Sequence, residues 1–341
     1  MSPAPPPLYV FGYPGPHGGA RTELWHTLRL WRRYGLAVTC IPLWKADPAW
    51  KARLDEIGVG TLILSPRAVR LPEGSTCISF CEHPFLRICP QLRGCRRLWA
   101  PCMNFHCDAE TALLREHGPL EGYVFQSRYQ QAQLGPLLES HGARIDTFHR
   151  VPGAFAWWDW PFCPGVHRPG QPLVIGRISR ADPAKYSPRL WKIYGNIPNV
   201  RARVMAWSPA VQTRCGPPPP WAEVLPKGAE PAEGFVRSLH VLVHPGGRAV
   251  ENWPRFVLEA MASGVPVVTD ASGGLPEMID DGRSGFLCHP PDRMAETALL
   301  LAEREDLRQE IAARARTALE NDLADPRTIW ACWHRLFDGL G

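Results

Sequence analysis

The sequence predicts an α/β protein built from two doubly wound domains, each a parallel sheet covered by helices. The chain has 341 residues, more than one ordinary hydrophobic core accommodates. Short apolar runs alternate with helical patterns, as expected for right-handed βαβ units. A loop rich in Pro and Gly, Pro161–Pro172, precedes a second alternating block that opens at Leu173. We therefore expect one domain in residues 1–165 and another in 166–325.

The first block begins with a strand candidate, Leu8–Phe11, a glycine-rich turn and an amphipathic helix at Glu23–Tyr34. Further strand candidates follow at Ala37–Pro42, Thr61–Leu64, Cys77–Phe80, Arg97–Ala100 and Gly122–Gln126. The second block offers strands at Leu173–Ile178, Val200–Met205, Leu239–His244 and Val265–Thr269, and helices at Asp292–Glu320 and Arg327–Phe337. No internal repeat interrupts this alternation, so the two-sheet prediction covers nearly the whole chain.

Composition narrows the class of protein. With 45% hydrophobic and 21% charged residues, the chain can bury a sizeable interior. A net charge of +5 suits anionic small molecules or an anionic membrane surface, but the sequence lacks the dense basic stripe of a nucleic-acid binder. We expect no nucleic-acid partner. No run of about 18 apolar residues predicts a membrane-spanning helix, and the N-terminus lacks a secretory-signal pattern, so we expect a cytoplasmic protein.

Six of the eleven cysteines lie between Cys77 and Cys107, with His83 and His106 among them. Zinc sites usually draw on two close pairs of ligands, and no CxxC occurs in the chain. The alternative is that these are buried free thiols on the strands of a cytosolic protein, which suits the spacing better. We therefore predict no metal site.

The most informative segment is a strand–loop–helix unit between Val241 and Val268. An apolar strand ends at His244, a glycine-containing loop follows, and a helix begins near Pro254, since proline is favoured in a first helical turn. A helix start offers unpaired N–H groups and partial positive charge, which suit a diphosphate. Glu251 lies in the loop, and Glu259 lies about a turn and a half inside the helix.

This unit resembles the E-x7-E element of retaining glycosyltransferases of the GT-B fold, family 4 type. The two acids are embedded in the family's "E…W.R..LEAMA.GVPVV" context. The resemblance implies that Glu251 lies near the donor sugar hydroxyls and Glu259 holds the ribose. It also implies two Rossmann-like domains facing a cleft, with a terminal helix, 326–341, that packs back onto the first domain.

The sequence departs from the family pattern just after the first glutamate. The family often has glycine or another small residue there, whose N–H group faces the phosphate. Here Asn252 and Pro254 occupy these positions, and Pro254 has no N–H to give. We therefore expect phosphate binding to depend more on Asn252, Trp253 and nearby basic residues.

A second segment, Gly176–Lys185, is similar to the family's G-R-x-x…K motif. In the family, an arginine and a lysine neutralise the leaving diphosphate, which requires fixed cations as negative charge develops. We assign this role to Arg177 and Lys185. Because the spacing is longer than expected, Arg180 is a competing candidate, and a solvated basic loop is the alternative.

Two glycine pairs match weaker family motifs. Gly18 and Gly19 close the first strand–helix turn, where glycine lets the backbone approach the donor phosphate or the acceptor. The segment Gly273–Glu277 resembles the family's "GG.pE" loop, which makes Glu277 a candidate donor contact. Each pair is equally compatible with a plain connecting turn.

Candidates on the acceptor side come from the first domain. His106 follows a strand at the place where family members put a cleft histidine, and could bind a sugar hydroxyl or the acceptor. His83 is the rival, and a structural histidine is the alternative. Trp157–Trp160 could stack on a sugar or pack between domains. The basic run Arg87–Arg97 fits either peripheral membrane contact or a solvated helix face.

The resemblance implies transfer of a sugar from a nucleotide-sugar to an acceptor hydroxyl, with retained anomeric configuration. No D-x-D sequence occurs, which fits side-chain cations in place of a divalent metal. We expect no cofactor beyond the donor itself, and the acceptor and oligomeric state are open. Two other classes remain: another GT-B enzyme, such as a sugar-nucleotide epimerase or a phosphorylase, and a non-catalytic scaffold subunit.

Overall fold

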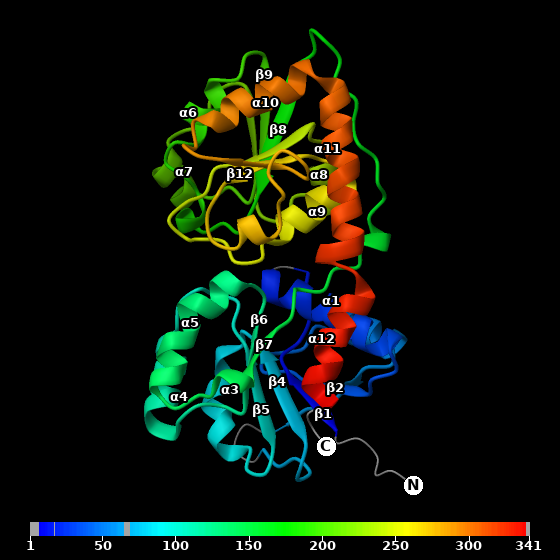
Figure 1. Cartoon of the computed structure of the whole chain (residues 1–341), viewed down its shortest axis with the longest axis vertical. Helices are drawn as coiled ribbons and strands as arrows, with labels where there is room; N and C mark the ends of the chain where they lie inside the picture. Colours follow the sequence, from blue (N-terminus) through cyan, green and yellow to red (C-terminus); the bar gives the residue numbers. More distant parts are fainter. Residues whose placement is uncertain (1–6, 17, 65–68, 339–341) are drawn as a thin grey trace. The chain divides into compact units, whose positions relative to one another are not determined.

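The computed structural model describes residues 7–16, 18–64 and 69–338, and the chain forms two compact units (Figure 1). Unit 1 comprises Met1–Phe155 together with Pro326–Gly341, and unit 2 comprises Ala156–Asp325. The division falls after Phe155, ten residues before the boundary that the linker composition suggests. The intervening residues pack with unit 2, where the Cys163 N–H donates to the Ser263 carbonyl at 3.2 Å.

Unit 1 is built on a seven-stranded parallel sheet with the order β3-β2-β1-β4-β5-β6-β7. The chain starts at β1, adds β2 and β3 on one side, and returns to place β4 on the other. The strands are β1 Leu8–Phe11, β2 Val38–Ile41, β3 Gly60–Thr61, β4 Thr76–Phe80, β5 Arg96–Ala100, β6 Gly122–Phe125 and β7 Phe148–Arg150.

Helices cover both faces of this sheet. One core contains side chains from α1 (Gly19–Arg33), α2 (Pro48–Glu56) and the terminal helix α12 (Pro326–Asp338). A second core contains side chains from α3 (His83–Ile88), α4 (Asp108–His117) and α5 (Arg128–Ser140). Short 3-10 turns lie at Cys89–Gln91 and Ile145–Thr147. Both faces of the sheet are therefore covered by helices and shielded from water, as is usual for parallel sheets.

The terminal helix is part of unit 1 because its apolar face enters the first core. Trp333 of α12 and Trp31 of α1 are almost completely buried and meet edge to face, with ring centroids 4.9 Å apart. Ile329 and Leu336 are buried in the same core. Aromatic pairs of this geometry contribute about 0.5–1.5 kcal/mol beyond their area burial.

Unit 2 is built on a six-stranded parallel sheet with the order β10-β9-β8-β11-β12-β13. The strands are β8 Leu173–Ile178, β9 Val200–Met205, β10 Ala222–Leu225, β11 Val241–His244, β12 Val267–Asp270 and β13 Phe286–Cys288. The helices are α6 Leu190–Gly195, α7 Pro209–Cys215, α8 Ala232–Arg237, α9 Arg255–Ser263, α10 Arg293–Glu303 and α11 Glu305–Ala318. Shorter turns lie at Trp157–Asp159, Pro183–Lys185, Leu275–Glu277 and Leu319–Leu323.

Two predicted elements differ in the structure. The predicted helix Asp292–Glu320 is interrupted at Arg304, whose φ of −117° and ψ of 77° end α10 and begin α11. The surrounding sequence is a run of charged residues without Gly or Pro, so no local signal marks the break. The strand predicted at Thr61–Leu64 is only the two-residue β3, Gly60–Thr61, at the edge of its sheet.

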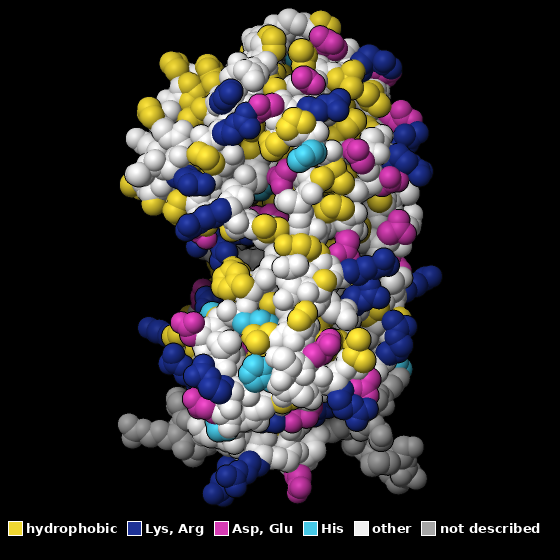
Figure 2. All heavy atoms as spheres, turned by 60° about the vertical axis from the view of Figure 1, so that its left-hand side comes forward, with side chains coloured by type: hydrophobic (Ala, Val, Ile, Leu, Met, Phe, Trp, Pro, Cys, Tyr) yellow, Lys and Arg dark blue, Asp and Glu magenta, His cyan; other side chains and the backbone are white. Residues whose placement is uncertain are grey.

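Positive and negative side chains are mixed on the surface, in agreement with the small net charge. On the face shown in Figure 2, Lys and Arg side chains are interspersed with Asp and Glu and form no continuous stripe. Among the described residues, no helix is both long and apolar enough to cross a membrane. The same part of the chain contains no group of three His, Cys, Asp or Glu side chains that could hold a metal ion.

Candidate functional site

The candidate site of unit 2 lies at the carboxyl edge of its sheet, where the strand order reverses. β8 lies between β9 and β11, so successive connections leave β8 toward opposite sides. In open parallel sheets, ligands bind outside the carboxyl ends of the strands at such a switch point. Arg177 is the next-to-last residue of β8, and His244 is the last residue of β11. The predicted arginine therefore lies at this edge.

Arg177 is fully buried and holds two loops together. Its guanidinium donates to the carbonyl oxygens of Lys185 and Pro245, each at 2.8 Å, and lies 4.2 Å from the centroid of the Tyr186 ring. No carboxylate of a described residue pairs with it. Carbonyl dipoles and an aromatic face stabilise the guanidinium, but no described carboxylate neutralises its positive charge at the carboxyl edge.

His244 completes this arrangement as a neutral ring. Burial, followed by the charges of Arg177 and Lys185, lowers the pKa of His244 well below its ordinary value. Its Nε2 lies 3.4 Å from an Arg177 nitrogen and accepts from it, which assigns the ring proton to Nδ1. The ring also stacks on Phe256 of α9, with centroids 3.9 Å apart.

Lys185 and Glu251 form an ion pair at the same edge. Lys185 ends the 3-10 turn Pro183–Lys185, which Asp182 caps by accepting from the Ala184 N–H at 2.9 Å. The Lys185 ammonium lies 2.7 Å from the Glu251 carboxylate, and the two side chains are only 11% and 15% exposed. The structure thus brings together the predicted lysine and the predicted sugar-side acid.

The loops that carry these two residues approach each other closely. The Ala249 N–H donates to the Ala184 carbonyl at 2.9 Å. A Cβ atom at Gly247 would lie 2.2 Å from that same carbonyl oxygen, so only glycine fits this position. The loop after β11 therefore packs directly against the turn that contains Lys185.

The predicted Gly273–Glu277 loop has a structural role in the same site. The Gly274 N–H donates to the Glu251 carbonyl at 3.0 Å, and a Cβ atom at Gly274 would lie 1.7 Å from the Asn252 carbonyl oxygen. The two glycines thus let one loop support the main chain of another. Glu277 itself is exposed in the following 3-10 turn.

Asn252 and Trp253, both predicted to bind the donor, are buried just before α9. Pro254 is the N-cap of this helix, whose first residue is Arg255. The indole N–H of Trp253 is buried and has no acceptor among the described residues. Arg180, the competing cation, is exposed, and none of the described residues pairs with it. Their predicted donor contacts stay predictions.

Glu259 lies in α9 in a poorly solvated environment. Burial raises the pKa of its carboxyl above the ordinary value, and the charge of Arg255 offsets only part of that effect. No residue in the described part of the chain donates a hydrogen bond to this carboxylate. A half-buried carboxylate that receives no hydrogen bond from the protein is suited to accept hydrogen bonds from hydroxyl groups of a ligand.

A cavity of about 650 Å³ opens beside the carboxyl ends of β9 and β10. Its lining combines one aromatic ring with polar and apolar side chains: Trp207, Ser208, Pro209, Gln212, Thr213, Pro217, Val224 and Pro226. Trp207 also contacts the ring of Tyr186, whose centroid lies 6.2 Å away. The cavity therefore adjoins the ring that packs on Arg177.

In unit 1, Gly18 and Gly19 begin α1. Gly18 is the N-cap with a φ of +95°, a conformation that favours glycine, and a Cβ atom there would meet no described atom within 4 Å. The first helix turn is thus open in the immediate surroundings of Gly18. His83 begins α3 and is exposed.

His106 is held by protein groups on both sides of its ring. Its Nε2 lies 3.0 Å from the Leu134 carbonyl, and its Nδ1 lies 3.2 Å from the Glu110 carboxylate. Burial lowers the pKa of His106, but Glu110 and the carbonyl outweigh burial and raise the pKa overall. Nδ1 lies close to Glu110 but makes no hydrogen bond to a described residue, and the predicted contact of His106 with sugar or acceptor stays a prediction.

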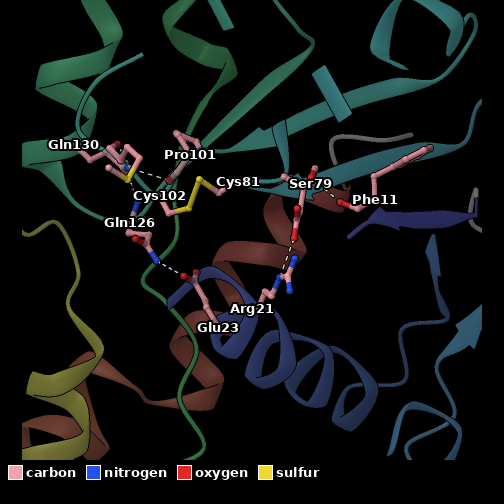
Figure 3. Close-up of a disulfide and its surroundings, with 11 residues drawn as sticks. Phe11, Arg21, Glu23, Ser79, Cys81, Pro101, Cys102, Gln126 and Gln130 are labelled. Atoms are coloured by element: carbon pink, nitrogen blue, oxygen red, sulfur yellow. Dashed lines mark hydrogen bonds and ion pairs between the residues drawn. A yellow bond between two sulfur atoms is a disulfide. The ribbon is translucent and has the colours of Figure 1, made fainter. Parts of the chain in front are cut away.

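The carboxyl edge of unit 1 contains a disulfide between Cys81 and Cys102, with Cα atoms 5.7 Å apart (Figure 3). The prediction of free thiols is wrong for these two cysteines. They follow the adjacent strands β4 and β5, and this adjacency brings them together although 21 positions separate them. Cys77, Cys89 and Cys95 are free and buried, as predicted, and Cys107 is free but only partly buried.

Side-chain hydrogen bonds extend from this disulfide toward α1. Gln130 donates to the carbonyls of Pro101 and Met103, at 2.7 and 2.9 Å, and Gln126 points to and donates to Glu23. Glu82, next to Cys81, accepts from Arg21 of α1 at 3.2 Å and from the Trp44 indole at 2.8 Å.

Sequence reasoning missed several residues of these two edges. His244 carried a usable signal, because a polar residue at the carboxyl end of an apolar strand commonly faces a ligand site. Gln130 and Gln126 carried none, since their partners lie far away in the sequence. Gly247 was visible as part of a glycine pair, but its contact with Ala184 requires knowledge of the neighbouring loop.

Comparisons with known proteins agree with this geometry. Residues 230–318, which contain Glu251 and Glu259, match the family model described as glycosyl transferases group 1. N-acetyl-alpha-D-glucosaminyl L-malate synthase of Bacillus anthracis is 38% identical over 81 residues, which are 23% of this chain and 21% of that protein. D-inositol 3-phosphate glycosyltransferase of Streptomyces scabiei is 35% identical over 98 residues, 28% of this chain and 22% of that protein.

Trehalose phosphorylase of Grifola frondosa is 38% identical over 69 residues, which are 20% of this chain and 9% of that protein. The matched segments span about a fifth or less of the length of these curated relatives. Over the whole chain the likeness is structural. Anabaena HepE, solved in complex with UDP-glucose, has a TM-score of 0.74 at 17% identity, covering 97% of this chain and 99% of that one.

The two doubly wound domains are those of the GT-B fold, as in this structural neighbour. The strand–loop–helix unit that carries both glutamates lies within the matched family segment. Residues 230–318 of this chain are thus similar to the glycosyl transferases of group 1, and the chain as a whole has the GT-B fold.

Proposed function

We propose that this chain is a retaining glycosyltransferase, which moves a sugar from a nucleotide-sugar to an acceptor hydroxyl without a metal ion. The observation that carries the proposal is the meeting of Lys185, Glu251 and the start of α9 at the carboxyl edge of the unit 2 sheet. A cation and a helix start suit a diphosphate, and a carboxylate beside them suits sugar hydroxyls.

The proposed transfer requires no base from the protein. The acceptor oxygen bonds to the anomeric carbon while the bond from that carbon to the diphosphate oxygen breaks, and the bonding electrons leave with the diphosphate. The hydroxyl proton passes to a diphosphate oxygen on the same face of the sugar, so the anomeric configuration is retained. Lys185 stabilises the negative charge that develops on the leaving group, and the nearby charge of Arg177 adds to the positive potential.

The remaining groups would bind the nucleoside. Glu259 has a carboxylate without a described hydrogen-bond donor, which supports its role as the acceptor for ribose hydroxyls. The cavity beside Trp207 has an aromatic wall and amide and hydroxyl groups, which suit a nucleobase. Solved complexes of Anabaena HepE contain UDP or UDP-glucose, which makes a UDP-sugar the first donor to test.

A phosphorylase is the second candidate, and the likeness to trehalose phosphorylase favours it. In that reaction, inorganic phosphate attacks the anomeric carbon of a sugar acetal, and no nucleotide takes part. Sugar 1-phosphate formation that depends on added phosphate would support this candidate. A scaffold subunit would bind nucleotide without turning it over, and an epimerase would change the donor sugar without an acceptor.

Thermal unfolding with UDP-, GDP-, ADP- and dTDP-sugars tests the proposal. A bound donor at 100 times its Kd stabilises the folded protein by about 2.7 kcal/mol, so the cognate nucleotide is expected to raise Tm. Donor consumption with an acceptor panel then measures transfer, and product NMR reads the anomeric configuration. No shift with any nucleotide would contradict the proposal, as would loss of transfer in chelator that added Mg²⁺ or Mn²⁺ restores.

A further inference from the structure

The Lys185–Glu251 pair raises a question that the proposed step leaves open, because both groups are assigned to the donor. In the structure, each charge neutralises the other at 2.7 Å, in a place where little of either side chain is exposed. Glu251 is the carboxylate that the described part of the chain offers to Lys185. A diphosphate therefore cannot take the full charge of Lys185 while this pair persists.

The main chains of both residues are held in place, so the side chains are the parts that can move. The Lys185 carbonyl accepts from the fully buried Arg177 at 2.8 Å. The Glu251 carbonyl accepts from the Gly274 N–H at 3.0 Å, and a Cβ atom on Gly273 would lie 2.1 Å from it. Rotation of two side chains then suffices to separate the ammonium from the carboxylate.

Other charges around the pair favour a phosphate over a carboxylate as the partner of Lys185. Arg177 is buried without an acidic partner among the described residues, and Arg180 and Arg248 are exposed without one. Glu251 offers Lys185 one negative charge, whereas a diphosphate carries more than one. A diphosphate is thus the stronger partner for the cations at this edge.

We propose that donor binding exchanges the partners of this ion pair, an inference that rests on the proposed function. The diphosphate takes the place of Glu251 at Lys185, and the released Glu251 carboxylate accepts hydrogen bonds from the sugar. After transfer the sugar has left, so Glu251 loses those bonds and returns to Lys185. The exchange thereby favours the intact nucleotide-sugar over the nucleoside diphosphate and promotes product release.

The exchange predicts effects of opposite sign from one substitution. In Glu251→Gln, Lys185 is free in the empty protein, so binding of the nucleoside diphosphate that best stabilises the wild type becomes about tenfold tighter, because an internal competitor is removed. Sugar transfer falls at the same time, since the carboxylate is lost. Titration calorimetry and kcat measure the two effects. Glu320→Gln, which breaks an ion pair with Arg316 elsewhere in unit 2, is the matched control and leaves both unchanged.

A second background separates exchange from simple charge repulsion. If Glu251 acts by competing for Lys185, Glu251→Gln does not tighten diphosphate binding in Lys185→Ala protein. Equal tightening with and without Lys185 would overturn the exchange, and so would weaker or unchanged binding to the single variant. These outcomes leave the proposed function intact if the wild type still binds the diphosphate and transfers sugar.

Wild-type crystals grown with the same nucleoside diphosphate provide a test that needs no variant. The exchange requires the distance from the Lys185 Nζ to the Glu251 carboxylate to increase from 2.7 Å to beyond the ion-pair range of about 4 Å. A bound diphosphate with the pair still closed overturns the exchange alone. A wild type that binds none of the four nucleoside diphosphates overturns the proposed function, and the exchange with it.

Discussion

The carboxyl edges of the two sheets are built by different means. In unit 2, loops touch through their main chains, and Gly247 and Gly274 lie where a Cβ atom would collide with a neighbouring carbonyl. In unit 1, the corresponding edge is tied by side chains, through the Cys81–Cys102 disulfide and the hydrogen bonds of Gln130. The first edge therefore requires glycine at two positions in addition to the side chain of Arg177, and the second relies on pairs of side chains.

This difference has consequences for tolerance to substitution. A main-chain contact of this kind allows no adjustment, because neither partner can rotate away. A side-chain bond can be lost or replaced with local relaxation. We therefore expect single substitutions to disturb the unit 2 edge more severely than the unit 1 edge.

Gly274→Ala gives the largest expected effect. The added Cβ would lie 1.7 Å from the Asn252 carbonyl oxygen, so the supporting loop must move, and we expect a loss of about 4 kcal/mol or more in the free energy of unfolding. The control is Gly142→Ala in unit 1, where φ is +92° but no atom lies within 4 Å, with a cost of roughly 1–2 kcal/mol. Urea unfolding measures both, and similar costs would contradict the claim that the main-chain contact makes Gly274 irreplaceable.

Removal of the Cys81–Cys102 disulfide tests the side-chain contacts of the unit 1 edge. For a crosslink between residues 21 positions apart, Cys81→Ser with Cys102→Ser lowers the stability of unit 1 by about 3 kcal/mol. Hydrogen exchange accelerates in β4 and β5, while β8 and β11 serve as the internal control. A thiol titration of the unfolded wild type that finds all eleven cysteines reduced would contradict the pairing.

Acid is expected to destabilise unit 2 more than unit 1. Burial lowers the pKa of His240 to about 4, and that of His244 is also depressed, so the unfolded chain binds these protons first as pH falls below about 6.5. The stabilising contributions of His240 and His244 are complete above that pH, and the loss from His240 alone is about 2 kcal/mol by pH 5; the raised pKa of Glu259 offsets part of this loss.

In unit 1 the two shifted histidines oppose each other. The pKa of His106 is raised, so its contribution is complete at low pH and is lost as pH rises through its folded pKa; the pKa of His149 is lowered, mainly by burial. Hydrogen exchange at pH 7.5 and 5 in each unit measures the difference. We expect His240→Gln to reduce the acid sensitivity of unit 2. Equal acid sensitivity of the two units, or an unchanged sensitivity of unit 2 in His240→Gln, would contradict this explanation.

Glu259→Ala is the smallest of these effects, because it removes one set of hydrogen bonds to a ligand. We expect nucleotide affinity to fall about tenfold, equivalent to about 1.4 kcal/mol, with little change in stability. Calorimetric titration measures the affinity, and Glu303→Ala, which changes an exposed acid of the same unit with no assigned donor contact, is the comparison variant. Unchanged affinity in Glu259→Ala would refute the ribose role.

The same contrast explains what could be predicted from the sequence. Strands such as Leu8–Phe11 and Leu173–Ile178 were predicted with the bounds that the structure shows, because buried parallel strands are continuous apolar runs. Lys185 and Glu251 were assigned through their resemblance to short family motifs, which are local in the sequence, and their roles toward the donor stay predictions. Their ion pair was not predicted, because it joins two loops 66 positions apart.

The unit 1 edge was harder to predict for the same physical reason. Gln130 and Cys102 act through partners that only the sheet order brings near, and neither has a distinctive local environment in the sequence. The short strands β7 and β13, each of three residues, are likewise set by their neighbours in the sheet. Local patterns thus identify strands and motif residues, whereas contacts between segments far apart in the sequence, including those of Gly247 and Gly274, require the fold.

The central claim is that a diphosphate binds at the carboxyl edge of unit 2, beside Lys185 and the start of α9. A crystal structure of the wild-type protein with its cognate nucleoside diphosphate tests this most directly. We expect a phosphate oxygen within hydrogen-bond distance of the Lys185 ammonium and the ribose within reach of Glu259. A diphosphate bound at the edge of unit 1, or one without contact to Lys185, would contradict it.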